Sequence, residues 1–222
     1  MTLYSSSMID RDGWSTEFGP QGGEKVDHSL GITVCDRSRK KEAVSLLKEG
    51  DIGMFYSKSK SVDDLGINCD HWRKVLSNFH PVEVEIDGCK YPSPEHAFHA
   101  AKVKCSSDPG KSKEFEVGGS ISHGPAAAKR MGGKGGFKQL GIELDVDKWN
   151  AVRDEEMLKI LKYRFENEEL FKMILMEISK KKITLLHFER SGKGSYWGGA
   201  IRKEDHQVVG RNRLGEMMMS LV

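Results

Sequence analysis

The sequence predicts a mainly helical domain with a few short β-strands, gathered as one small sheet or hairpin. The chain has 222 residues, which is long enough to bury a hydrophobic core without disulfide bonds. Apolar residues recur at helical spacing through residues 147–180, the longest regular pattern in the chain. Runs with the two-residue period of a strand are all short, so strands form a minor part of the predicted fold.

The composition excludes several classes of protein. Four cysteines lie far apart without a C-x-x-C pair, so a zinc ribbon and a thiol redox motif are not expected. The 35 lysines and arginines barely exceed the 33 aspartates and glutamates, so phosphate recognition must depend on local groups. No apolar run approaches the ~20 residues of a membrane span, and no signal peptide is visible. We therefore expect a soluble, cytoplasmic protein without a membrane partner.

The chain divides into an N-terminal extension, residues 1–50, and a domain, residues 51–222. Residues 1–36 are rich in Ser, Gly and Asp without a sustained period, so this part is expected to be irregular. Residues 37–49 have apolar residues at helical spacing and a basic first half, which predicts a surface helix. The domain then begins with a short apolar run, residues 52–56, that is typical of a buried strand.

A hairpin follows the polar loop at residues 57–74. Residues 82–86 alternate with the period of a strand, and Asp87 and Gly88 supply a tight turn before the chain returns through Tyr91. This part of the chain therefore predicts two antiparallel strands.

The next helix begins near Pro94, because proline suits the first turn of a helix. Glu95, His99 and Lys102 are spaced i, i+4 and i+7, so they share one face of this helix. A carboxylate, an imidazole and an ammonium group on one face indicate either catalytic chemistry or an ion pair.

The rest of the chain is predicted to be mostly helical. The glycine cluster at residues 132–136, with Lys134, could hold a phosphate, but it lacks the P-loop spacing, so a flexible connector is the favoured interpretation. Further helices are predicted at residues 113–117, 124–131, 147–166, 167–180 and 210–221, and a further strand at residues 183–188.

The order of several motifs resembles a known family. The string LSNF is followed by the hairpin and by P-x-x-E-H-x-F-x-x-x-K, and DIGMFY precedes it. After it come GPAAAKRMG, WNAVRDEEM, FER, YWGG and G-x-N-x-L-G-x-x-M-M. Over residues 51–222 the chain resembles the NADAR superfamily of YbiA-like N-glycosidases. The resemblance implies a YbiA-like multihelical single domain that acts as a hydrolase on N-glycosyl bonds.

The resemblance also implies which residues form the site. Cleavage of an N-glycosidic bond passes through an oxocarbenium-like transition state that needs a carboxylate near the anomeric carbon, and Glu95 matches this role. Lys102 matches the family lysine, either as a contact to a phosphate or hydroxyl of the ribose or as a Schiff-base amine. The substrate-binding residues implied are Ser77, Asn78, Phe79, His99, Trp149, Arg153, Glu189, Tyr196, Trp197 and Asn212.

One of these residues, Arg153, has several conceivable partners. Trp149, Arg153 and Met157 form one stripe of a predicted helix, and a buried guanidinium group needs an anion. That anion is Glu95, another internal carboxylate or a substrate phosphate.

The chain departs from the family pattern at two positions. His99 occupies a position where the motif usually has Gln, which makes it a specificity residue in our interpretation. Gly194 stands three residues before Trp197, where the pattern typically has Asp. The loss of this Asp bears on substrate choice or on activity itself.

The substrate implied is small, either an early riboflavin-pathway intermediate that carries ribose phosphate or an ADP-ribosylated guanine base. No nicotinamide or flavin cofactor is implied, and the H-x-x-H pair of His96 and His99 lacks a third ligand at a recognised metal spacing. Because of Gly194, the alternative is a non-catalytic module that binds NAD or ADP-ribose. A third hypothesis is a glycosidase that acts on modified nucleic acid and contacts it through the basic residues 37–41.

Overall fold

The structure is a computed structural model that describes residues 44–222, except residues 191, 203 and 206. The described residues belong to one compact unit. The basic residues 37–41 lie outside the described part, as does most of the helix predicted at residues 37–49. The boundary predicted between an extension and a domain at residue 50 stays a prediction.

The described end of that predicted helix, residues 44–49, is not helical, so the prediction is wrong there. The backbone amide of Leu47 donates to the carbonyl oxygen of Asp64 at 2.8 Å, and the amide of Lys48 donates to the carboxylate of Asp51 at 2.7 Å. These hydrogen bonds take the place of the backbone hydrogen bonds of a helix, because residues 44–49 pair with the loop that follows β1.

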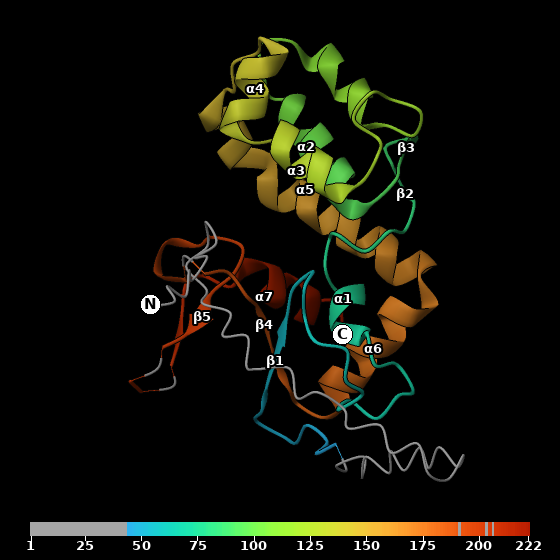
Figure 1. Cartoon of the computed structure of the whole chain (residues 1–222), viewed down its shortest axis with the longest axis vertical. Coiled ribbons are helices and arrows are strands. Elements are labelled where there is room, and N and C mark those ends of the chain that lie inside the picture. The colour runs from blue at the N-terminus through green and yellow to red at the C-terminus, as the bar shows by residue number, and fades with distance from the viewer. Residues whose placement is uncertain (1–43, 191, 203, 206) are drawn as a thin grey trace, which may run out of the picture. The chain divides into compact units, whose positions relative to one another are not determined.

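The domain is mainly helical, as predicted (Figure 1). The elements in chain order are β1 (Ile52–Phe55), α1 (Trp72–Val75), β2 (Val84–Ile86), β3 (Cys89–Tyr91), α2 (Pro94–Val103), the 3-10 helix η1 (Pro109–Phe115), α3 (Pro125–Met131), α4 (Lys134–Leu140), α5 (Val146–Asn167), α6 (Glu169–Lys180), β4 (Thr184–His187), the 3-10 helix η2 (Gly192–Gly194), β5 (Ala200–Ile201), β6 (Val208–Val209) and α7 (Arg213–Met219). Within the described residues, no helix is long and apolar enough to cross a membrane.

The strands of the described residues form three two-stranded sheets, and the expectation of one small sheet or hairpin is wrong. The predicted hairpin is one of them: β2 and β3 are antiparallel, and its turn residues Asp87 and Gly88 have φ values of 51° and 76°, as a two-residue hairpin turn requires. β1 instead pairs in parallel with β4, with Ile52 opposite Thr184, and β5 pairs with β6. Parallel pairing needs a long crossover, and here the chain from α1 to α6 provides it.

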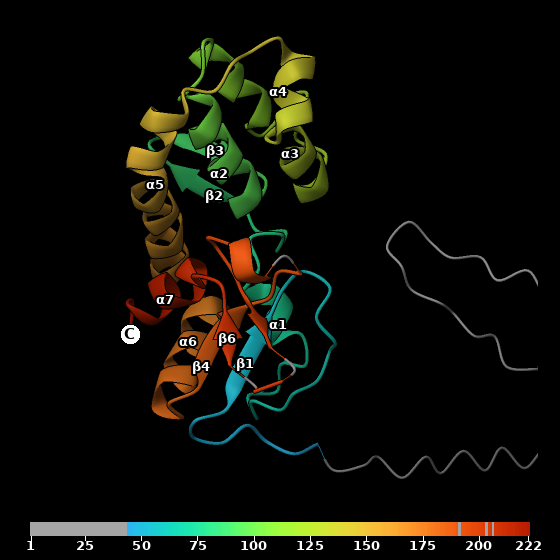
Figure 2. The ribbon, with the colours of Figure 1, turned by 90° about the vertical axis from the view of Figure 1, so that its left-hand side faces the viewer.

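The elements form two groups joined by the long helix α5 (Figures 1 and 2). One group holds α2, α3, α4 and the β2–β3 hairpin, and the other holds β1, β4, α1, α6 and α7. α5 contacts α2 and β2 in the first group and α6 and α7 in the second. Its N-terminus is capped by the side chain of Asp145, which accepts a hydrogen bond from the amide of Lys148 at 2.9 Å.

The glycine cluster is not a flexible connector, because α4 begins within it at Lys134. Gly136 packs so closely against α3 that a Cβ atom there would lie 2.1 Å from the carbonyl oxygen of Met131. Gly132 is packed in the same way against the ring of His99. These glycines are therefore needed for the close approach of α4 and α2 to the end of α3.

Arg164 of α5 is buried in the core and makes polar contacts to two neighbours. Its side chain is 1% exposed, and its Nε donates to the Glu168 carboxylate at 2.8 Å. One terminal nitrogen donates to the carbonyl oxygen of Val75 at 2.7 Å, and the guanidinium group lies 4.0 Å from the centroid of the Phe171 ring. Arg164 thus connects α5 to α1 and α6.

We expect Arg164→Met to lower the free energy of unfolding by about 3–5 kcal/mol, because it leaves the Glu168 carboxylate without its buried partner. The measurement is chemical denaturation, with Lys162→Met as the matched control, since Lys162 is exposed on the same helix. A change of less than about 1 kcal/mol for Arg164→Met would contradict a structural role for this pair.

Candidate active site

A cavity of about 340 Å³ opens where the carboxyl ends of the parallel strands β1 and β4 meet one face of α2. Both strand ends lie at the same edge because the strands are parallel, and this edge is where ligands bind in many parallel sheets. The cavity is lined by Tyr56, Ser57, Ser77, Asn78, Phe79, Glu95, Phe98, His99, Lys102, Lys129, Met157, His187, Phe188, Glu189, Trp197 and Leu214.

The polar face predicted for α2 lines this cavity. Pro94 is the first residue of the helix, and the amide of Glu95 donates to the carbonyl oxygen of Asn78 at 3.0 Å. The Glu95 carboxylate pairs with Nε2 of His99 at 3.2 Å. Lys102 donates from Nζ to the carbonyl oxygen of Gly132 at 3.0 Å. Within the described residues, the face therefore holds a contact between a carboxylate and an imidazole, and a lysine without a carboxylate contact of its own.

The ammonium group of Lys102 lies in a poorly hydrated position. Burial lowers the pKa of Lys102 below its usual range of about 10.5, because removal from water disfavours the charged form. A larger fraction of this amine is therefore neutral at physiological pH than is the case for an exposed lysine. A neutral amine is the form that reacts with a carbonyl group.

The loop Ser77–Phe79 forms a second wall. The backbone amide of Phe79 donates to the Ser77 hydroxyl at 3.2 Å, which fixes the turn. The amide nitrogen of Asn78 contacts the sulfur atom of Met157 at 3.6 Å, while its Oδ1 is buried without a hydrogen-bond partner. Because buried acceptors are normally paired, a donor on a ligand is the expected partner of this oxygen.

Glu189 lines the cavity from the segment after β4. The Ser195 hydroxyl donates to the Glu189 carboxylate and accepts from the amide of Gly198 at 2.9 Å, so its orientation is fixed. Nδ1 of His187 lies 4.0 Å from the same carboxylate. Burial lowers the pKa of His187, which favours the neutral imidazole. The cavity thus holds a second carboxylate, held in place by Ser195.

Aromatic rings connect the cavity to the domain interior. The ring of Phe98 makes edge contacts with Trp197 at 5.3 Å and with Trp149 at 5.2 Å between centroids. Trp197 also contacts the ring of Tyr196 at 5.0 Å. Only Phe98 and Trp197 of these four line the cavity. Trp149 does not line the cavity but packs against Phe98, which does.

Four of the residues predicted to bind substrate do not line the cavity: Trp149, Arg153, Tyr196 and Asn212. The Tyr196 hydroxyl donates to Asp154 at 2.6 Å. The side-chain amide nitrogen of Asn212 donates to the carbonyl oxygen of Leu185 at 2.7 Å, and its Oδ1 accepts from the backbone amide of His187 at 3.0 Å. These two hydrogen bonds connect the start of α7 to β4. Direct contact of these four residues with substrate stays a prediction.

Arg153 stacks on the ring of Tyr196, with 3.6 Å between the guanidinium carbon and the ring centroid. Glu95, one of its three conceivable partners, is paired with His99 instead.

We expect Arg153→Ala to weaken binding of ribose 5-phosphate by less than threefold and to cost about 1 kcal/mol of stability through the lost cation–π contact. Thermal melts with and without the ligand measure both effects. A loss of ligand protection equivalent to 2 kcal/mol or more would instead assign Arg153 to a substrate phosphate.

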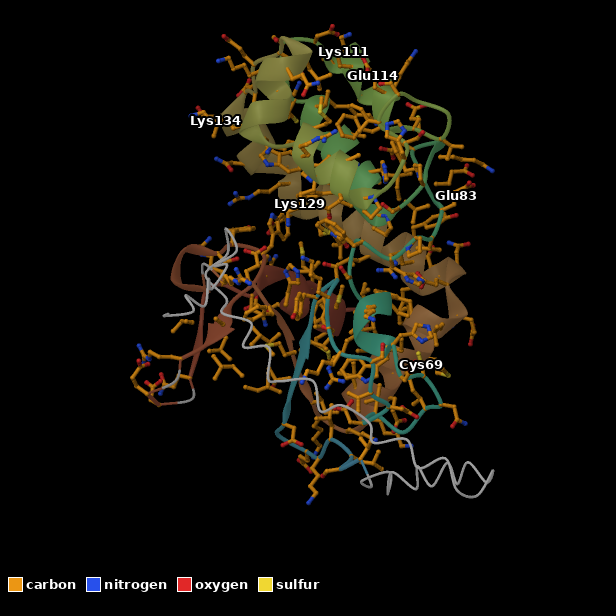
Figure 3. All side chains as sticks on the ribbon, viewed as in Figure 1. Cys69, Glu83, Lys111, Glu114, Lys129 and Lys134 are labelled. Atoms are coloured by element: carbon orange, nitrogen blue, oxygen red, sulfur yellow. The ribbon has the colours of Figure 1, made fainter. Side chains whose placement is uncertain are left out.

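Eight lining residues are not among the predicted site residues: Tyr56, Ser57, Phe98, Lys129, Met157, His187, Phe188 and Leu214. Tyr56 and Lys129 lie within the strings DIGMFY and GPAAAKRMG, so the motifs contained a signal for them. His187 precedes the string FER and had no such signal. Figure 3 shows Lys129 near the junction of the two groups of elements, and its Nζ lies 5.5 Å from the centroid of the Phe79 ring. The cavity therefore has a second lysine besides Lys102.

The histidines of the H-x-x-H pair point to different neighbours. Nδ1 of His96 is 2.7 Å from the Ser93 hydroxyl, and Nε2 is 3.1 Å from the carbonyl oxygen of Ile121. Because a carbonyl oxygen only accepts, Nε2 donates and Nδ1 accepts from Ser93. Both nitrogens of His96 are thus used inside the protein, while His99 faces the cavity. Among the residues described, no cluster of three His, Cys, Asp or Glu side chains could hold a metal ion.

Gly194, where the family pattern has Asp, is exposed and does not line the cavity. A Cβ atom there would meet no atom within 4 Å, so the missing side chain leaves open space rather than a gap in the core. The cavity is lined by two carboxylates, Glu95 and Glu189, and neither depends on the residue at position 194 to be there.

The mainly helical domain is similar in fold to a YbiA-like protein of known structure. The NMR structure of the E. coli protein YbiA matches with a TM-score of 0.55 and 26% identity, covering 82% of this chain and 89% of that one. The chain belongs to the NADAR family, whose domain description matches residues 55–221. Relatives named N-glycosidase YbiA from Shigella flexneri serotype 5b, Shigella sonnei and E. coli K12 are each 29% identical over 167 residues, or 75% of this chain and 84% of theirs. The resemblance seen in the motifs is confirmed.

Proposed function

We propose that this protein is an N-glycosidase that hydrolyses the N-glycosyl bond of a substrate with a ribosyl phosphate group. The observation that carries the proposal is that Glu95 and Lys102, from one face of α2, line the same cavity as Glu189 and Trp197. Family membership and the relatives named N-glycosidase support the same reaction class. The substrate is a riboflavin-pathway intermediate or an ADP-ribosylated guanine base.

In the proposed reaction Glu95 acts at the anomeric carbon. As the C1–N bond breaks, its electron pair passes to the base nitrogen and positive charge develops on the sugar, which the carboxylate stabilises. Water then adds to C1, and its proton is transferred through the carboxylate to the leaving base, so that a free base and a free sugar hydroxyl result. His99 holds the carboxylate in place through the 3.2 Å contact.

The other walls bind the two ends of the substrate. Lys102 and Lys129 provide ammonium groups for the phosphate or ribose hydroxyls, and Asn78 offers its unpaired Oδ1 to a sugar hydroxyl. The leaving base stacks on Trp197, whose ring borders the cavity. With its lowered pKa, Lys102 is also suited to form a Schiff base with the ring-opened sugar.

The alternative is a non-catalytic module that binds NAD or ADP-ribose, and Gly194 is the feature that favours it. Product analysis decides between the two. The purified protein is incubated with each candidate substrate, and the free base is quantified by chromatography. Release of the base at a rate above that of the Glu95→Gln variant supports the glycosidase. Recovery of an intact ligand that nevertheless raises the melting temperature would assign the binding module.

A further inference from the structure

Trp197, which borders the cavity, lies on a segment with little regular structure of its own. Between β4 and β5 the described residues form one short 3-10 helix, η2, which ends at the exposed Gly194. Position 194 therefore has no side chain that could hold the segment in place. The orientation of the Trp197 ring must be set by contacts to other parts of the domain.

Tyr196 supplies one of these contacts. Its ring lies almost perpendicular to the ring of Trp197, with 5.0 Å between the centroids and an interplanar angle of 86°. Edge-to-face pairs of this kind are a preferred arrangement of aromatic rings. Since Tyr196 does not line the cavity, its ring supports Trp197 from outside it. A change in the position of the Tyr196 ring would therefore move Trp197 or leave a gap beside it.

The ring of Tyr196 is fixed in turn by Asp154 of α5. The Tyr196 hydroxyl donates to Oδ1 of Asp154 at 2.6 Å, and Nε of Arg213 donates to Oδ2 at 2.8 Å, so both carboxylate oxygens are used. Burial alone would raise the pKa of Asp154, but the hydrogen bonds from Tyr196 and Arg213 hold this pKa below its usual range. Asp154 is therefore a charged acceptor at physiological pH, and hydrogen bonds to charged groups are stronger than those between neutral groups.

The start of α7 holds the backbone of the same two residues. The amide of Arg213 donates to the carbonyl oxygen of Tyr196 at 3.1 Å, and the amide of Leu214 donates to that of Trp197 at 3.0 Å. Both amides belong to the first turn of a helix, where they have no partner within the helix. These bonds fix the chain but leave the side chains free to change rotamer. The directed hydrogen bond from Tyr196 to Asp154 supplies the additional constraint on the rings.

We propose that Asp154 is a positioning residue for the leaving base, because it orients Tyr196, and Tyr196 holds the Trp197 ring on which the base stacks. The proposal rests on the proposed function, which places the base at Trp197. Asp154 does not line the cavity, so it acts on the substrate only through these two rings. Loss of its carboxylate should weaken the binding of a ligand that carries a base and leave the binding of ribose 5-phosphate unchanged.

The first test follows the Trp197 ring without a ligand. The indole N–H signal of Trp197 is assigned in an NMR spectrum by its absence from the Trp197→Phe variant. This signal should shift in both Asp154→Ala and Tyr196→Phe, because each variant removes the hydrogen bond that fixes the neighbouring ring. Arg213→Met is the matched control, since it removes the other partner of Asp154 and should leave the signal in place.

An unshifted Trp197 signal in Asp154→Ala and Tyr196→Phe would overturn the proposal. An equal shift in Arg213→Met would overturn it as well, because Asp154 would then act by joining α5 to α7 rather than through the Tyr196 hydroxyl.

The second test compares two ligands by isothermal titration calorimetry: guanosine 5′-monophosphate, which carries a base on the ribosyl phosphate, and ribose 5-phosphate, which does not. The wild type should bind the nucleotide about tenfold more tightly, as expected for a base stacked on an aromatic ring. Asp154→Ala and Tyr196→Phe should each lower this preference to about threefold or less. The double variant should lower it no further, because both changes break the same hydrogen bond.

An equal loss of affinity for both ligands would contradict the proposal, since it would indicate general damage to the cavity. Equal binding of both ligands by the wild type would also contradict it, because Trp197 would then hold no base. Release of the free base is measured separately on the same preparations. Expected affinities without release of a base would support the positioning role of Asp154 and refute the glycosidase, so the failures of the two proposals are distinguishable.

Discussion

Replacing Glu95 by glutamine is expected to lower the rate of N-glycosyl hydrolysis by about 10³-fold or more. Glutamine has the same shape but no negative charge, so it cannot stabilise the positive charge that develops on the sugar. Its side-chain oxygen can still accept from Nε2 of His99, which now lies 3.2 Å from the carboxylate. The fold should therefore be retained, with a change in the free energy of unfolding below about 1 kcal/mol.

The rate is measured by release of the free base, and folding by thermal denaturation. The matched control is Glu83→Gln, because Glu83 is an exposed carboxylate outside the cavity. Figure 3 shows Glu83 away from Lys129 and the junction. Full turnover by Glu95→Gln would remove this residue from the mechanism, and Glu189 would become the carboxylate to test.

Replacing Lys102 by methionine is expected to lower the turnover rate by about 10²-fold or more, in either of its two roles. Methionine keeps most of the apolar stem and removes the amine, so the loss reports on the nitrogen atom. Folding should be retained, because the one hydrogen bond lost is that to the carbonyl oxygen of Gly132. A variant with wild-type turnover would contradict both roles.

Lys102→Arg then separates the two roles. Arginine keeps the charge and binds phosphate well, so a contact role would preserve much of the activity, whereas a Schiff base requires a primary amine. If the imine forms, borohydride reduces it to a stable secondary amine, and the adduct is located by mass spectrometry. Lys129→Met is the control, since Lys129 is the other lysine that lines the cavity. An adduct on Lys129 would transfer the covalent role to that residue.

Local patterns in the sequence predicted much of the fold and one wall of the site. The spacing of Glu95, His99 and Lys102 sufficed to place them on one face, because helix geometry alone determines it. The hairpin turn at Asp87 and Gly88 was equally local. Such features depend on residues a few positions apart.

Features that depend on distant residues could not be predicted in this way. The parallel pairing of β1 with β4 brings Tyr56 and His187 to the same cavity, and no short-range period encodes that pairing. The stacking of Arg153 on Tyr196 likewise depends on the path of the chain after β4. The glycine cluster was misinterpreted because glycine suggests flexibility, whereas Gly132 and Gly136 serve close packing here. Tertiary contacts decide each of these cases.

The pairing of β1 with β4 has a consequence for the order in which the protein folds. Ile52 lies opposite Thr184, so every helix from α1 to α6 must be synthesised before the pair can close. Contacts of such long range form slowly, because the intervening chain must be ordered first. A growing chain that ends before β4 therefore already has Glu95 and Lys102 but lacks one side of the cavity. Catalytic competence should appear abruptly, in the last stage of folding, and truncation within β4 should abolish ligand binding while α2 still forms.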